Sequence, residues 1–155
     1  MTRINCVPPE ELHDRHLVAE YHELPRVFGL VKKAISRKLN KDDFISYDTY
    51  TFGSGHVKFF YTRLKWLAER QALLIEEMLR RKMRPRHSNF TELFMGIGPE
   101  WFGDWSPTEA DKKLNRARLG ERLEEMKRKK RRVVMTPYNE AQLSAAMEKN
   151  DETAR

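Results

Sequence analysis

The first residues that could do chemistry stand at the start of the chain, which begins Met1-Thr2-Arg3. The initiator methionine is commonly removed before a small residue such as threonine, and its removal would leave a free α-amine on Thr2. An α-amine ordinarily has a pKa of about 7.7–8.0, so much of it is unprotonated at neutral pH. A neighbouring cation such as Arg3 lowers that pKa further. Such an amine can attack a sugar carbon and form an imine, although many chains share this start.

The second candidate residue is a carboxylate, Glu23, which lies on the first helix that we predict. Glu23 is one residue off the apolar stripe of that helix, so it lies at the flank, and Arg26 follows one turn later. The residues alone favour a solvated carboxylate paired with Arg26, which is an ordinary arrangement on helices.

Other enzyme classes lack their motifs here. The sequence contains no glycine-rich phosphate loop, no CxxC and no HExxH. His13, His16 and Glu20 share a helix face and could in principle bind a metal, but no further ligand cluster accompanies them. We therefore predict no metal and no cofactor. The single cysteine, Cys6, has no base beside it in sequence and is expected to be a small buried residue.

Composition points to a polyanionic partner. Lys and Arg number 30 against 23 Asp and Glu, which gives a net charge of +7 and a pI of about 9.6. Nucleic acid is the first candidate for the partner and an anionic membrane surface the second, while a solvated basic protein is the alternative. Residues 112–132 hold eleven Lys or Arg and three Glu, either a phosphate-binding track or a solvated face. The sequence has no signal-peptide pattern and no apolar run of about 18 residues. Because a single cysteine cannot form an internal disulfide, we expect a cytoplasmic protein, associated with the nucleoid if it is bacterial.

Helical periodicity appears in three segments, and no strand pattern is convincing. The first segment carries an apolar stripe that Pro25 interrupts, so we predict a bend there. The predicted helices span about Pro9–Lys38, His56–Lys82 and Pro107–Arg132. Between the second and third lies an irregular stretch whose aromatic residues are expected to cover the core.

These patterns predict an all-α fold, a compact single domain of three main helices with long ordered loops. We assign residues 1–132 to the domain and residues 133–155 to a partly flexible tail.

Three ordered segments carry a resemblance to a known family. MTRIN, AEYHELPRVFG and GSGHVKFFYTRLKWLAERQ together resemble the pyrimidine-dimer DNA glycosylase family, the phage-type endonuclease V. A weaker similarity covers PEWFGDWSPTEA and ARLGER, so the resemblance spans about residues 1–126. It implies a monomeric base-excision repair enzyme for pyrimidine dimers in double-stranded DNA. It also implies AP lyase activity through an imine on the N-terminal α-amine.

The resemblance also implies roles for individual residues. Thr2 matches the nucleophile and Glu23 matches the catalytic carboxylate. Basic residues that grip the phosphates around the lesion are matched by Arg3, Arg26, Arg118 and Arg122.

The sequence departs from the family pattern in places that bear on the substrate. His22, a DNA-contacting position beside Glu23, replaces an arginine, and a mostly neutral imidazole lacks the permanent charge and donor fork of arginine. Arg122 replaces a lysine, which is a mild change for a phosphate contact and does not bear on the substrate. The tail continues from Lys127 as KRKKRR in place of an aromatic-rich segment. Two alternatives therefore remain: a glycosylase/AP lyase for another damaged or modified base, and a non-catalytic DNA-binding protein.

Overall fold

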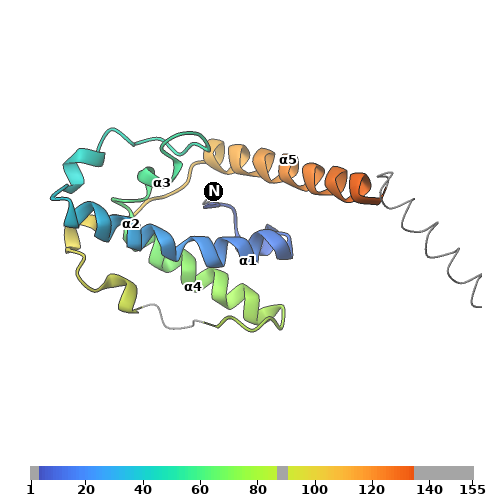
Figure 1. Cartoon of the computed structure of the whole chain (residues 1–155), viewed down its shortest axis with the longest axis horizontal. Coiled ribbons are helices and arrows are strands. Elements are labelled where there is room, and N and C mark those ends of the chain that lie inside the picture. The colour runs from blue at the N-terminus through green and yellow to red at the C-terminus, as the bar shows by residue number, and fades with distance from the viewer. Residues whose placement is uncertain (1–3, 87–90, 135–155) are drawn as a thin grey trace, which may run out of the picture. The chain divides into compact units, whose positions relative to one another are not determined.

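The computed structural model describes residues 4–86 and 91–134, and the described residues are folded as helices and loops (Figure 1). The α-helices are α1 (Asp14–Glu23), α2 (Pro25–Ser36), α3 (His56–Phe59), α4 (Leu64–Arg80) and α5 (Glu109–Val134). Short 3-10 helices occupy η1 (Pro9–Glu11), η2 (Lys41–Phe44), η3 (Thr91–Phe94) and η4 (Pro99–Trp101). The prediction of an all-α fold is confirmed. The chain divides into two compact units, residues 1–113 and 114–155.

The first predicted helix is wrong at its start and is two helices rather than one. Pro9–Glu11 forms a 3-10 turn, and α1 begins only at Asp14, where the side chain of His13 accepts a hydrogen bond from the backbone N–H of Arg15 at 3.1 Å. The predicted interruption at Pro25 is confirmed, since α2 begins at that residue. Proline has no N–H for the carbonyl of Tyr21. The Nε2 of Gln71 donates to that carbonyl instead, at 3.2 Å.

The second predicted helix, His56–Lys82, is also two helices, α3 and α4. The intervening residues run through Phe60, Tyr61 and Thr62, types with moderate helix propensity that are enriched in extended chain. The carbonyl of Thr62 accepts from the N–H of Gly103 at 3.1 Å, so the break pairs with a distant loop. A Cβ at Gly103 would collide with that carbonyl, and only glycine fits.

The core of the first unit lies where α1, α2 and α4 pack together. The contacts join α1 to α4 and α1 to α2, and Figure 1 shows α1 and α4 side by side. Aromatic rings from α3 and the following loops close one end, with Trp105 packed at 5.0 Å from Phe59 and 4.9 Å from Trp66. Trp101 is 2% exposed. The prediction that the loop aromatics cover the core is therefore confirmed for these rings, while Phe90 lies outside the described residues.

Helix α5 begins two residues later than predicted. Thr108, not Ser106, caps it: the hydroxyl of Thr108 accepts from the N–H of Asp111 at 3.1 Å, and the carboxylate of Asp111 accepts from the N–H of Thr108 at 2.9 Å. This reciprocal pair is a capping box. Within residues 4–86 and 91–134, no helix combines the length and apolar character needed to cross a membrane.

Candidate active site

The chain segment that follows the candidate nucleophile is buried although it has no regular secondary structure. Ile4 and Val7 are fully buried and Asn5 is 5% exposed. The backbone N–H of Ile4 donates to Nε2 of His56 at 2.8 Å, and the hydroxyl of Tyr50 donates to the carbonyl of Ile4 at 2.8 Å. Both polar backbone groups of Ile4 are thus bound by side chains from one distant loop and helix. Thr2 and Arg3 themselves lie outside the described residues.

The chemistry of His56 and Tyr50 suits this binding. Nδ1 of His56 lies 2.7 Å from the carbonyl of Thr51, so it carries the proton, which leaves Nε2 as the acceptor for Ile4. The left-handed backbone of Gly55, with φ of 91°, turns the chain immediately before His56. Burial, followed by the neighbouring Cys6 thiol, raises the pKa of Tyr50 above its ordinary range. The phenol therefore stays protonated and remains a donor.

A buried polar network fastens the same segment to α1 and α4. The Nδ2 of Asn5 donates to Oε1 of Glu20 at 2.7 Å. The guanidinium of Arg70 donates to both carboxylate oxygens of Glu20, at 2.8 and 3.1 Å, and to the carbonyl of Val7 at 2.6 Å. Glu20 and Arg70 are 1% and 4% exposed. The two opposite charges neutralise each other in a place that excludes water. Each partner also makes a hydrogen bond to the N-terminal segment, Glu20 to Asn5 and Arg70 to the carbonyl of Val7.

Glu23 lies one turn after Glu20 on α1, so their Cβ atoms are about 5–6 Å apart. Its side chain is 24% exposed and its carboxylate pairs with the guanidinium of Arg26 at 3.2 Å. The Arg26 side chain is 67% exposed. The structure therefore contains the ion pair that the sequence suggested, in a partly exposed position one turn after Glu20, to which the N-terminal segment is bonded.

His22 lies beside Glu23 and is exposed to solvent, with its ring in an edge contact 5.0 Å from Tyr21. An exposed position on this flank of α1 is compatible with contact to a large ligand.

The metal site that His13, His16 and Glu20 could have formed is not assembled. Glu20 points into its buried contacts with Arg70 and Asn5, whereas His13 is exposed and caps α1. Among the residues that the structure describes, no group of three or more His, Cys, Asp or Glu is arranged to hold a metal ion.

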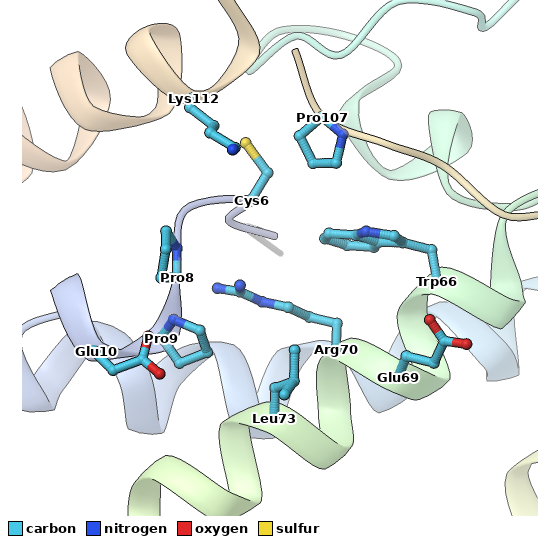
Figure 2. Close-up of a pocket in the computed structure, with 10 residues that line it drawn as sticks. All are labelled: Cys6, Pro8, Pro9, Glu10, Trp66, Glu69, Arg70, Leu73, Pro107 and Lys112. Atoms are coloured by element: carbon cyan, nitrogen blue, oxygen red, sulfur yellow. The ribbon is translucent and has the colours of Figure 1, made fainter. Parts of the chain in front are cut away.

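A pocket of about 360 Å³ is lined by residues of the N-terminal segment, of α4 and of the chain around the start of α5 (Figure 2). Arg70 extends from α4 toward the backbone near Pro8, with Trp66 and Cys6 on other sides of the space. Cys6 is 6% exposed, which confirms the prediction of a buried cysteine. Burial raises the pKa of its thiol to about 11, so it is a poor nucleophile at neutral pH.

The other predicted DNA contacts lie in the second unit, on α5. Arg118 and Arg122 are four residues apart and share one face of the helix. Arg118 pairs with Glu121 at 3.2 Å, with side chains 31% and 64% exposed. Farther along, residues 127–132 are exposed cations, of which Lys127 pairs with Glu124 at 3.3 Å.

Sequence reasoning missed four residues that hold the site together: Tyr50, His56, Glu20 and Arg70. Glu20 was considered only as one of three possible metal ligands. A usable signal was present for two of them, because Glu20 follows Leu17 by three residues and Arg70 follows Leu67 by three, which are core positions of their helices. Opposite charges at core positions of two helices indicate a buried ion pair.

Comparison with known families identifies the family of the chain. The family model for pyrimidine dimer DNA glycosylase matches residues 1–91, more than half of the 155-residue chain. The matched region holds the buried N-terminal segment, Glu23 and the residues that anchor them. The chain belongs to the pyrimidine dimer DNA glycosylase family and is an enzyme of the DNA glycosylase class.

Proposed function

We propose that this protein is a monomeric glycosylase and AP lyase that acts on pyrimidine dimers in double-stranded DNA, with the α-amine of Thr2 as nucleophile and Glu23 as the catalytic carboxylate. One observation carries the proposal. The bond from Asn5 to Glu20 attaches the described part of the N-terminal segment to α1 one turn before Glu23, whose carboxylate is partly exposed. A nucleophile and a carboxylate on one sugar are what this chemistry requires.

The reaction would proceed through a covalent intermediate. The nitrogen of Thr2 bonds to C1′ as the bond from C1′ to the base breaks, and the base leaves with the electron pair and a proton. Opening of the C1′–O4′ bond gives a protonated imine. Loss of a C2′ proton then lets the C3′–O bond break, which expels the 3′ phosphate and nicks the strand. Glu23 stabilises the cationic sugar and imine and serves the proton transfers.

Basic side chains on both units would bind the DNA backbone. Arg26 is exposed enough to reach a phosphate while its other contact is Glu23. Arg3, Arg118 and Arg122 are proposed to bind further phosphates, and the cations at residues 127–132 would extend that track. A glycosylase must also bend the duplex and extrude a nucleotide to reach the sugar.

A second candidate keeps the chemistry and changes the lesion. Its support is the exposed His22 beside Glu23, in a position where the family pattern has an arginine. An imidazole lacks the fork of five donors that a guanidinium carries, so His22 would bind phosphate or an extruded base more weakly than arginine does. Processing of thymine dimers by the His22→Arg variant separates the candidates. An improvement favours a substrate other than thymine dimers for the natural protein, and no change leaves thymine dimers as the better choice.

Borohydride trapping tests the proposed function. The protein is incubated with duplexes that carry a thymine dimer, an abasic site or an oxidised pyrimidine, and the adducts are digested and mapped. We expect an adduct through the α-amine of Thr2 with the abasic and the thymine-dimer duplexes. An adduct at a lysine with Thr2 unmodified would refute the nucleophile. Binding without any adduct or nicking would indicate the non-catalytic DNA-binding alternative.

A further inference from the structure

We infer that His56 and Tyr50 are positioning residues for the reaction, because together they hold both backbone groups of Ile4 and so set where the Thr2 amine can stand. The inference rests on the proposed function, in which Thr2 is the nucleophile. The pair is named the Ile4 clamp below: Nε2 of His56 accepts from the N–H of Ile4, and the hydroxyl of Tyr50 donates to its carbonyl, each at 2.8 Å.

Chain length makes the clamp relevant to the nucleophile. Two residues separate the nitrogen of Thr2 from the nitrogen of Ile4, so the amine lies at most about 7 Å from the clamped N–H. Reaction requires the nitrogen to approach C1′ within about 3–3.5 Å, and a misplacement of about 1 Å can reduce the rate by about 10²-fold. If the backbone of Ile4 could move, the nitrogen of Thr2 would therefore move by nearly the same distance.

The clamp is itself rigid. The ring of His56 stacks on Phe52 with centroids 5.0 Å apart and meets Phe60 edge-on at 5.7 Å. Its Nδ1 is fixed by the carbonyl of Thr51 at 2.7 Å. Tyr50 packs against the same rings, with its centroid 5.7 Å from that of His56. Neither ring can shift without disturbing the aromatic cluster, which is what a positioning device needs.

Residues 4–7 have no helical or strand hydrogen bonding, so side chains fix the segment in place of a ladder. The Asn5, Glu20 and Arg70 contacts hold its far part. Ile4 is the nearest described residue to Thr2, and the clamp acts on that residue. Buried backbone groups need partners in any protein, so a purely structural role is the alternative that the experiment must separate.

The experiment uses the full chain and measures the single-turnover rate of borohydride trapping at a preformed abasic site, with enzyme in excess. The variants are Tyr50→Phe, His56→Gln, His56→Ala and an insertion of one glycine after Arg3. Tyr50→Phe removes one hydroxyl without changing ring volume. His56→Gln retains an acceptor near the position of Nε2. The insertion leaves the clamp intact but displaces the amine by about one residue, 3.3–3.6 Å when extended.

We expect the trapping rate to fall about 10-fold in Tyr50→Phe and about 10²-fold in His56→Ala and in the insertion, with partial recovery in His56→Gln. Dissociation constants for the abasic duplex should stay within about twofold, because His56 and Tyr50 are buried. Tyr61→Phe is the matched control: it also loses a hydroxyl from a buried tyrosine, whose ring packs 4.9 Å from Phe44, and its trapping rate should not change.

Two results overturn the inference. One is a Tyr50→Phe or His56→Gln variant that folds and forms the trapped Thr2 adduct as fast as the natural chain. This result decides the question even if His56→Ala fails to fold. The other is an equal loss in the Tyr61→Phe control, which would mean that general destabilisation sets the rate. Failure of the proposed function is distinguishable from both, because the adduct of the natural chain would then map to a residue other than Thr2.

Discussion

Replacement of Arg70 by methionine should be among the most damaging single changes in the first unit. Arg70 and Glu20 are 4% and 1% exposed, and the guanidinium makes two bonds to the carboxylate and one to the carbonyl of Val7. Methionine fills much of the same volume but donates no hydrogen bond. Arg70→Met therefore leaves Glu20 as a buried charge that still accepts a hydrogen bond from Asn5 but has lost its cation.

The magnitude follows from that uncompensated charge. Removing one partner of a buried ion pair typically costs about 3–5 kcal/mol of the free energy of unfolding. A domain has about 5–15 kcal/mol in total, so the variant should be close to its folding limit. For a chain of this length each kcal/mol lowers the Tm by about 2–4 °C, which predicts a fall of about 6–20 °C.

Urea unfolding followed by circular dichroism measures the cost, and a double variant tests its cause. Glu20→Gln with Arg70→Met removes both charges and keeps an oxygen that can accept from Asn5. The carbonyl of Val7 still lacks its donor, which costs about 1–3 kcal/mol. We expect the double variant to be more stable than Arg70→Met alone. A single variant that loses less than about 1 kcal/mol, or a double variant whose loss equals the sum of the two single losses, would refute the reasoning.

Three further predictions concern the reaction, the DNA contact and the cysteine. Glu23→Gln should lower glycosylase turnover by at least about 10²-fold, while binding to the lesion duplex persists. The control Glu76→Gln changes an exposed carboxylate on α4 and should leave turnover unchanged. Near-normal turnover by Glu23→Gln would exclude the catalytic role. Arg118→Ala combined with Arg122→Ala should weaken binding to all duplexes and reduce the slope of log K against log salt by about one to two units, and an unchanged slope would place the DNA elsewhere. Burial raises the pKa of the Cys6 thiol to about 11, so its alkylation at pH 8 should be at least about 10²-fold slower in the folded protein than in the urea-unfolded protein. The alkylation rate of the folded protein should rise as the pH approaches 11. Equal rates in the folded and unfolded protein would contradict the burial.

Local patterns predicted the helical class and failed where distant contacts override them. The apolar stripe and Pro25 located α1 and α2, because 3.6-residue periodicity and a missing N–H act within one turn. The break before α4 was not predicted. It depends on Thr62 pairing with Gly103, a partner 41 residues away (103 − 62) that periodicity cannot register. The N-cap at Thr108 was missed because Ser106-Pro107 carries a competing start signal.

The candidate site, too, could be predicted from the sequence only where local position decides. Position on a helix face was enough to place Glu23 at an accessible flank. The burial of Glu20 was missed, because the residue was considered only as a possible metal ligand although it lies in the stripe with Leu17 and Leu24. His56 had no local signal at all, since its partner Ile4 is 52 residues away in sequence. Its role depends on a tertiary contact.

A nucleophile that is the backbone amine of a chain end needs the chain end itself to be held in place, which a side-chain nucleophile does not. A lysine or serine is held by the helix or strand that carries it, whereas chain ends are ordinarily poorly ordered unless something fastens them. In the part of the chain that the structure describes, side chains fasten Ile4, Asn5 and Val7, none of which lies in a helix or strand. The fold therefore uses buried polar side chains, which are costly to desolvate, in a place where apolar packing alone would hold the segment but leave its register undefined. If Thr2 is the nucleophile, that cost has a function: the polar contacts select one register of the segment, and the register decides where the amine stands.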